Sequence, residues 1–221
     1  MAKNPLALGV LASGSGTNLQ SIIEAIEAKG LPAEIRVILC NRPDARAMER
    51  GRAHGLPVEL LDHKTFAKRE DFDARLVEIL RERGVELVCL AGFDRLITPV
   101  FVRAFPGRIL NIHPALLPAF KGLHGQRQAL EYGVKLAGAT VHFVDEETDH
   151  GPIVIQAAVP VLDGDDEVAL QKRILAEEHR IYPEAIRLFA EGRLRIEGRK
   201  VRILDGPTST TDALTHPSAT R

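Results

Sequence analysis

The chain has 221 residues, of which 45% are hydrophobic and 27% charged, and its formal net charge is −1. This length suits one large domain or two small ones with a substantial core. A charge so close to zero argues against nucleic acid as the main partner, whereas a small anionic ligand needs only a local positive site. Because no segment approaches the roughly 18 apolar residues of a membrane-spanning helix, we expect no membrane association.

The two cysteines, Cys40 and Cys89, both lie in apolar runs. They provide neither a disulfide framework nor a metal-binding pattern. We interpret the apolar run near the N-terminus as a buried strand and not as a signal peptide. The sequence therefore predicts a cytoplasmic protein without a metal ion.

In the first half of the chain, short apolar runs alternate with segments of helical periodicity. The predicted elements are strands at 6–12, 33–40, 57–61, 86–90 and 108–112, and helices at 17–29, 43–54 and 69–83. Such apolar strands are expected to be buried on both faces, as in a parallel sheet covered by helices. The pattern predicts an α/β fold with an open, mostly parallel twisted sheet and helices on both faces.

In the second half of the chain the regular alternation of strands and helices ends. This half predicts a loop at 113–125, a helix at 126–132, strands at 135–144 and 152–161, a helix at 166–190 and a hairpin at 192–204. These strands make the C-terminal half partly antiparallel, and Pro183 is expected to kink or break the long helix. We expect a single domain over 1–205, with halves at 1–112 and 113–205, and a disordered tail at 206–221.

A glycine-rich segment, Ser13-Gly-Ser-Gly-Thr-Asn18, joins the first predicted strand to the first predicted helix. At this position glycines let the backbone approach a phosphate, and the helix N-terminus offers free N–H groups. Leu19 replaces the third glycine of a dinucleotide fingerprint, and the second strand has no acidic residue at its end. The segment therefore predicts a site for a single phosphate. The alternative is a tight turn in which Ser and Thr cap the helix.

Asn111 and His113 stand two residues apart at the end of the fifth predicted strand. Their side chains are therefore expected to point the same way, toward the sheet edge where α/β proteins bind ligands. An amide and an imidazole together are suited to stabilising an oxyanion. The alternative is that Asn111 ends the strand and His113 packs in the core.

An acidic loop follows the sixth predicted strand, and one of its carboxylates could orient the ring of His113 and favour its charged form. The candidates are Asp145, Glu146, Glu147 and Asp149. The pattern does not choose among them, although a fixed turn at Gly151-Pro152 favours Asp149. The alternative is a solvated acidic turn.

These residues carry a likeness to a known family. It lies in LASGSGTNLQSII from residue 11, LAGFDRLITP from 90, NIHPALLPAFKGLHGQRQAL from 111, GATVHFVDEETDHGPIVIQ from 138 and EEHRIYPEAI from 177. In this order, over about residues 6 to 204, they resemble the phosphoribosylglycinamide formyltransferase family of folate-dependent enzymes. Asn-Ile-His-Pro followed by Leu-Leu-Pro is specific to folate formyltransferases, and the glycine loop narrows the likeness to the purine enzyme.

The resemblance implies a Rossmann-like formyltransferase fold and a set of roles. It implies catalysis by Asn111, His113 and Asp149, phosphate binding by Gly14, Ser15, Gly16, Thr17 and Asn18, substrate contact by Glu178, and a folate site lined by Arg69, Asp94, Arg95, Leu96, Ile97 and Asn111. His142 lies on a nearby predicted strand and would support the site, the alternative being that it simply packs. The donor would be 10-formyltetrahydrofolate, the acceptor phosphoribosylglycinamide, and the setting de novo purine biosynthesis. The partners would be small molecules only, and the chain a monomer or homodimer.

Asp94 departs from the family pattern, because an apolar residue is usual there. Its charge is expected to change folate affinity or to meet a nearby cation.

Rival functions would need further features. A formyltetrahydrofolate hydrolase would use the same trio with water as acceptor, but it resembles this chain with an added N-terminal regulatory domain. A first strand at residue 6 is expected to leave no room for one. Methionyl-tRNA formyltransferase adds a C-terminal domain and a basic surface. A non-catalytic nucleotide-binding module or a dehydrogenase domain would need a fuller glycine fingerprint.

Overall fold

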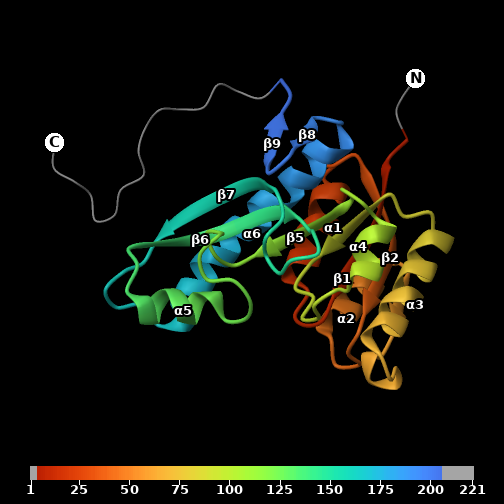
Figure 1. The fold of residues 1–221 in the computed structure, drawn as a ribbon, viewed down its shortest axis with the longest axis horizontal. Helices are drawn as coiled ribbons and strands as arrows, with labels where there is room; N and C mark the ends of the chain where they lie inside the picture. Colours follow the sequence, from red (N-terminus) through yellow and green to blue (C-terminus); the bar gives the residue numbers. More distant parts are fainter. Residues whose placement is uncertain (1–3, 206–221) are drawn as a thin grey trace.

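A computed structural model describes residues 4–205, and the tail predicted to be disordered lies outside them. In the described part the strands are β1 (Leu6–Ala12), β2 (Ala33–Cys40), β3 (Val58–Leu60), β4 (Leu87–Leu90), β5 (Ile109–His113), β6 (Leu136–Phe143), β7 (Ile153–Pro160), β8 (Leu194–Glu197) and β9 (Lys200–Ile203). They form one sheet in the order β3-β2-β1-β4-β5-β6-β7-β9-β8 (Figure 1).

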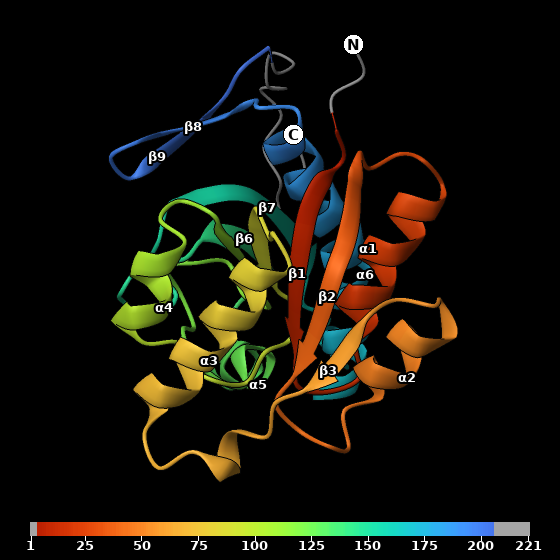
Figure 2. The same cartoon turned by 90° about the vertical axis from the view of Figure 1, so that its right-hand side faces the viewer.

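Helices cover both faces of this sheet. They are α1 (Thr17–Glu27), α2 (Arg46–Ala53), α3 (Arg69–Glu82), α4 (Pro99–Ala104), α5 (Gly125–Tyr132) and α6 (Glu167–Ala190), with a 3-10 turn η1 (His63–Thr65). Leu8 and Val10 of β1 pack with α1, α2 and α6, whereas Leu11 packs with α3 and α4 on the opposite face (Figure 2). Apolar residues at both odd and even positions of β1 thus serve two cores, which confirms the α/β prediction.

The strand directions divide the sheet into two parts. The strands β1 to β5 pair parallel with one another, whereas β5 pairs antiparallel with β6, and β6 with β7. The hairpin β8–β9 is antiparallel and joins β7 through one parallel pair, Ile153 with Lys200. The mostly parallel sheet with a partly antiparallel C-terminal half is therefore confirmed.

Two predicted helices differ from the observed ones. The prediction of a break at Pro183 is wrong, because α6 runs as a single helix from Glu167 to Ala190. Buried neighbours hold it on the sheet, including Tyr182, whose hydroxyl lies 3.0 Å from the carbonyl oxygens of Leu90 and Leu110. The helix predicted from residue 43 begins at Arg46, because the preceding residues form a turn. Neither α4 nor η1 is predicted by the sequence pattern.

The parallel strands bring the glycine segment and the Asn111–His113 pair to one edge. Leu11 of β1 pairs with Leu90 of β4, which pairs with Asn111 of β5. Neighbouring strands lie roughly 4.8 Å apart, so the ends of β1 and β5 are separated by about 10 Å. This distance suits a ligand that reaches from the glycine segment to the Asn–His pair.

Candidate active site

Asn111 is oriented by the strand beside it. It lies opposite His142 in the antiparallel pairing of β5 with β6, and its Nδ2 is 3.2 Å from Nε2 of His142. The Nδ1 atom of His142 lies 2.8 Å from the carbonyl oxygen of Phe143. The ring therefore donates from Nδ1 and accepts the Asn111 amide at Nε2, which leaves the second N–H of that amide for a ligand.

His142 is kept in this neutral form by its surroundings. Burial lowers the pKa of its ring below the usual value, and the nearby His113 acts in the same direction. The carbonyl of Phe143 and the carboxylate of Asp149 oppose the change without reversing it. A neutral ring is the form that can accept a hydrogen bond from Asn111.

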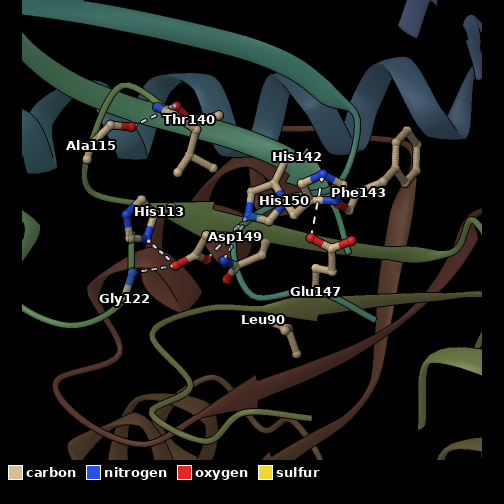
Figure 3. A network of polar contacts seen from close by, with 12 residues as sticks. Leu90, His113, Ala115, Gly122, Thr140, His142, Phe143, Glu147, Asp149 and His150 are labelled. Atoms are coloured by element: carbon tan, nitrogen blue, oxygen red, sulfur yellow. Dashed lines mark hydrogen bonds and ion pairs between the residues drawn. The ribbon is translucent and has the colours of Figure 1, made fainter. Parts of the chain in front are cut away.

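His113 is buried, with 4% of its surface exposed, and oxygen atoms face both ring nitrogens. Its Nε2 lies 2.9 Å from the carbonyl oxygen of Phe120, and its Nδ1 lies 3.5 Å from Oδ2 of Asp149 (Figure 3). A ring with an oxygen at each nitrogen is best satisfied when it carries two protons. The arrangement therefore suits a cationic imidazole beside a carboxylate.

Asp149 reaches the imidazoles from a loop in an unusual conformation. Its backbone φ is 46°, in the left-handed region that residues other than glycine seldom adopt. Its Oδ2 accepts the Gly122 N–H at 2.8 Å, and its Oδ1 lies 3.8 Å from Nε2 of His142. At Gly151, a Cβ would overlap the carbonyl oxygen of Phe143, so the loop requires glycine there.

The loop that contacts both His113 and Asp149 is supported by Thr140. The Thr140 hydroxyl donates to the Ala115 carbonyl at 2.7 Å and accepts the Leu117 N–H at 3.0 Å. Gln156 of β7 donates to the Leu117 carbonyl at 2.9 Å and to the Thr140 hydroxyl at 3.0 Å. Thr140 pairs across the strands with His113 and with Gln156, so a polar row on β5, β6 and β7 supports the loop.

The glycine segment packs its backbone against α2. Its carbonyls face α2, where Gly14 accepts from the Ala47 N–H at 3.1 Å and Ser15 accepts from Nε of Arg50 at 2.8 Å. Within residues 4–205, the N–H groups of Ser15 and Gly16 have no hydrogen-bond acceptor. Gly16 precedes α1 with φ 70°, and no side chain caps the helix. The alternative of a turn closed by Ser or Thr caps is thus not what the segment adopts.

Asn18 and Glu178 meet beside the glycine segment. Nδ2 of Asn18 donates to Oε2 of Glu178 at 2.6 Å, and both residues are buried. Burial raises the pKa of Glu178, and the bond from Asn18 offsets only part of this effect. The Oδ1 atom of Asn18 is buried without a partner in the described residues. An unsatisfied buried acceptor and an acid that is easily protonated indicate a site for a polar ligand.

The segment from Asp94 to Ile97 is held by α3 and by the two residues that follow β2. Nη2 of Arg69 donates to the Leu96 carbonyl at 2.6 Å, and the Leu96 side chain is 58% exposed. Asp94 accepts from Nδ2 of Asn41 at 2.9 Å and pairs with Arg42 at 3.3 Å. Asp94 thus meets a cation, as the sequence suggests.

Asp94 is charged in this setting. Burial raises the pKa of its carboxyl, but the bonds from Asn41 and Arg42 outweigh this and hold the pKa below the usual value. Its backbone N–H donates to the Ser13 hydroxyl at 2.8 Å, which joins this segment to the glycine segment. A cavity of about 480 Å³ opens beside it, lined by Asn41, Arg42, Pro43, Asp44, Asp62, His63, Lys64, Asp94 and Arg95.

Most residues singled out in the sequence are brought together. Asp149 lies close to both His113 and His142, and His142 contacts Asn111. Asn18 contacts Glu178. The pattern does not identify five further contributors, namely Phe120, Gly122, Thr140, Gln156 and Arg50. Phe120 and Gly122 act through backbone atoms, which no side-chain pattern reveals. Thr140 could have been found as the i−2 neighbour of His142 on a strand.

Residues 4–205 contain no cluster of three or more histidine, cysteine or acidic side chains arranged to hold a metal ion. In the same range, no helix has the length and apolar character needed to cross a bilayer.

Known proteins are similar to this chain in sequence and fold. Residues 7–186 match the model of the formyl transferase family. The phosphoribosylglycinamide formyltransferase of Escherichia coli is 44% identical over 187 residues, which are 85% of this chain and 88% of that protein. The trifunctional purine biosynthetic protein adenosine-3 of Drosophila pseudoobscura pseudoobscura is 48% identical over 190 residues, but the chain spans only 14% of its length.

Solved structures agree with these relatives. The crystal structure of glycinamide ribonucleotide transformylase 1 from Symbiobacterium toebii is 57% identical and superimposes with a TM-score of 0.91, covering 92% of this chain and 96% of that one. The family match over residues 7–186 spans the site residues from the glycine segment to Glu178. The chain therefore belongs to the formyl transferase family, in the branch that contains the phosphoribosylglycinamide formyltransferases.

Proposed function

We propose that this chain transfers the formyl group of 10-formyltetrahydrofolate to the amine of 5'-phosphoribosylglycinamide, a step of de novo purine biosynthesis. The observation that carries the proposal is the convergence of Asn111, His113 and Asp149 at the edge that also holds the glycine segment. The names of the E. coli and Symbiobacterium toebii relatives support this choice of acceptor.

The acceptor site is proposed to lie between the glycine segment and Glu178. The N–H groups from Ser15 to Asn18 would bind the phosphate, together with Gly14, because the start of a helix favours an anion. Arg50, bonded to the Ser15 carbonyl, supplies a positive charge close by. Glu178 and the unpartnered Oδ1 of Asn18 would bind the sugar or its amide.

The donor is proposed to bind against Arg69 and the segment from Asp94 to Ile97. The exposed Leu96 side chain offers an apolar surface for a flat ring. Arg69 and Arg95 lie near it and suit the carboxylates of a folate. Asn111 would contact the formyl oxygen at the other end, since its second amide N–H is available.

The proposed reaction begins when the acceptor amine attacks the formyl carbon, so that a C–N bond forms and the formyl oxygen becomes an oxyanion. The Asn111 amide and the protonated ring of His113 stabilise this oxygen. The bond between the formyl carbon and the donor nitrogen then breaks. The proton lost by the attacking amine passes to the leaving nitrogen through Asp149 and a water molecule.

The test mixes the protein with 10-formyltetrahydrofolate and phosphoribosylglycinamide and follows the release of tetrahydrofolate. We expect release only when the ribonucleotide is present. Release without it would identify a hydrolase. Thermal stabilisation by the ribonucleotide and a folate analogue, but not by NAD, separates both functions from a nucleotide-binding module.

Variants of the trio test the mechanism. Asn111→Ala and His113→Ala each remove one group that stabilises the oxyanion, so turnover should fall on the order of 100- to 1000-fold. The folded state should survive, as measured by circular dichroism. Near-normal turnover in His113→Ala would show that the mechanism is wrong.

We further infer that the reaction takes place in the cytoplasm and involves small molecules only. The two cysteines, Cys40 and Cys89, are buried and unpaired, as expected in a reducing compartment.

A further inference from the structure

One arginine from the C-terminal hairpin contacts the loop that carries Asp149. Arg199 lies in the turn between β8 and β9, and its Nη1 is 2.8 Å from Nε2 of His150. Its Nη2 donates to the His150 carbonyl at 2.6 Å. Nδ1 of His150 lies 2.8 Å from Oδ2 of Asp145. The residue next to Asp149 is therefore held at its carbonyl and at both ring nitrogens.

We propose that Arg199 is a positioning residue for Asp149, an inference that rests on the function proposed above. Asp149 has a left-handed backbone, and such a conformation in a residue other than glycine persists only where its surroundings enforce it. On the inner side, the Gly122 N–H binds the carboxylate. On the outer side, Arg199 fixes the following residue, His150, whose ring is drawn beside Glu147 in Figure 3.

The His150 ring links the hairpin to the start of the acidic loop. The Asp145 carboxylate can only accept, so Nδ1 of His150 donates to it, while Nη1 of Arg199 approaches the same ring at 2.8 Å from Nε2 and 3.2 Å from Nδ1. A continuous chain of hydrogen bonds therefore runs from the hairpin turn to the first residue of the acidic loop. It fixes the loop at Asp145 and at His150, on either side of the proposed catalytic carboxylate.

Within residues 4–205, the hairpin pairs with the rest of the sheet at one place. The strand β9 meets β7 through a single register pair. The other two arginines on the hairpin strands, Arg195 and Arg202, both pair with Glu197 within the hairpin. Arg202 is therefore a matched control, because its loss removes a hairpin guanidinium without removing a contact to His150.

The test compares the wild-type chain with Arg199→Ala, Arg199→Lys and Arg202→Ala. Because Arg199 is exposed, the alanine variant should fold with a thermal midpoint close to that of the wild type. Its kcat should fall about tenfold or more, since small errors in the position of a catalytic group are costly. The KM for phosphoribosylglycinamide should stay constant. Hydrogen exchange across residues 145–151 should become faster, as measured by mass spectrometry.

The controls decide between positioning and general support. Arg202→Ala should match the wild type in kcat and in exchange, and Arg199→Lys should recover part of the loss. The proposal is overturned if Arg199→Ala keeps wild-type kcat, if kcat falls without faster exchange in the loop, or if Arg202→Ala shows an equal loss. A wild-type chain that transfers no formyl group would refute the proposed function instead, and exchange would still report whether Arg199 holds the loop.

Discussion

The amide nitrogen of Asn111 lies 3.2 Å from Nε2 of His142, and that ring is itself fixed by the Phe143 carbonyl. The direction of the Asn111 amide is thus determined by a neighbour that need not touch substrate. Because the neutral state of His142 comes from its burial, the same packing that builds the core also aims the group proposed to stabilise the oxyanion.

Replacing His142 should therefore impair catalysis through Asn111. We expect His142→Leu to lower kcat by about 10- to 100-fold, because the amide loses its acceptor and can rotate. His142→Gln offers an amide oxygen in a similar place and should retain more activity. Steady-state kinetics at constant temperature measures both. Equal activity in the two variants would mean that the acceptor is unimportant.

Thr140 should matter to stability and to catalysis together. Thr140→Val keeps the shape of the side chain but leaves the Leu117 N–H and the Ala115 carbonyl without their partner. We expect the free energy of unfolding to fall by about 1–3 kcal/mol, with a loss of kcat because the loop contacts His113 and Asp149. Urea unfolding measures the first effect. Thr140→Ser keeps the hydroxyl and should restore most of both, so a serine variant as poor as valine contradicts this role.

Glu178 should lower the stability of the unliganded protein at neutral pH. Its folded pKa is raised by burial, so the folded chain binds its proton more tightly than the unfolded chain does. The stabilisation that protonated Glu178 contributes is fully present below its ordinary pKa of about 4.5. It is lost as pH rises through the folded pKa.

Glu178→Gln should therefore raise the thermal midpoint at pH 7 by about 2–4 °C, the shift that corresponds to roughly 1 kcal/mol. Near pH 4 the variant and the wild type should unfold at the same temperature. The variant should also transfer the formyl group more slowly than the wild type. Calorimetry at both pH values checks the sign. A midpoint at pH 7 below that of the wild type would disagree with it.

Arg50 should affect the phosphorylated acceptor selectively. Arg50→Ala removes the bond to the Ser15 carbonyl and a charge beside the glycine segment. We expect the KM for phosphoribosylglycinamide to rise about tenfold, with little change in kcat. An acceptor without its phosphate should bind equally well to both proteins. Arg52→Ala, on the same helix, is the control, and a similar rise in KM there would assign the effect to net charge alone.

The strands of the first half were open to prediction because each buries both faces. The predicted ranges 6–12 and 33–40 match β1 and β2. The helix α4 has six residues, too few for a periodic signal. Its start depends on a tertiary contact, in which the Thr98 N–H donates to buried Asp73 of α3 at 2.5 Å. Pro183 misleads for a similar reason, because packing around it outweighs its local preference.

The candidate site divides in the same way. Asn111 and His113 follow from strand alternation alone. Which of four nearby acids reaches His113 depends on a left-handed residue at Asp149 and on the Gly122 N–H, and both depend on how two separate loops meet. The family likeness, and not the local pattern, is what singles out Asp149.

The antiparallel pairing of β5, β6 and β7 makes the proposed chemistry depend on the register of β6, because successive side chains point to opposite faces of the sheet. Removing or adding one residue inside β6 would exchange Thr140 and His142 for the apolar neighbours that alternate with them. Such a chain could still form a hydrogen-bonded sheet, yet Val141, which lies opposite Ile112, would then lie opposite Asn111 or His113. Insertions and deletions in this strand should therefore be far less tolerated than point substitutions. Any engineering of the site has to preserve the alternation of side chains along β6.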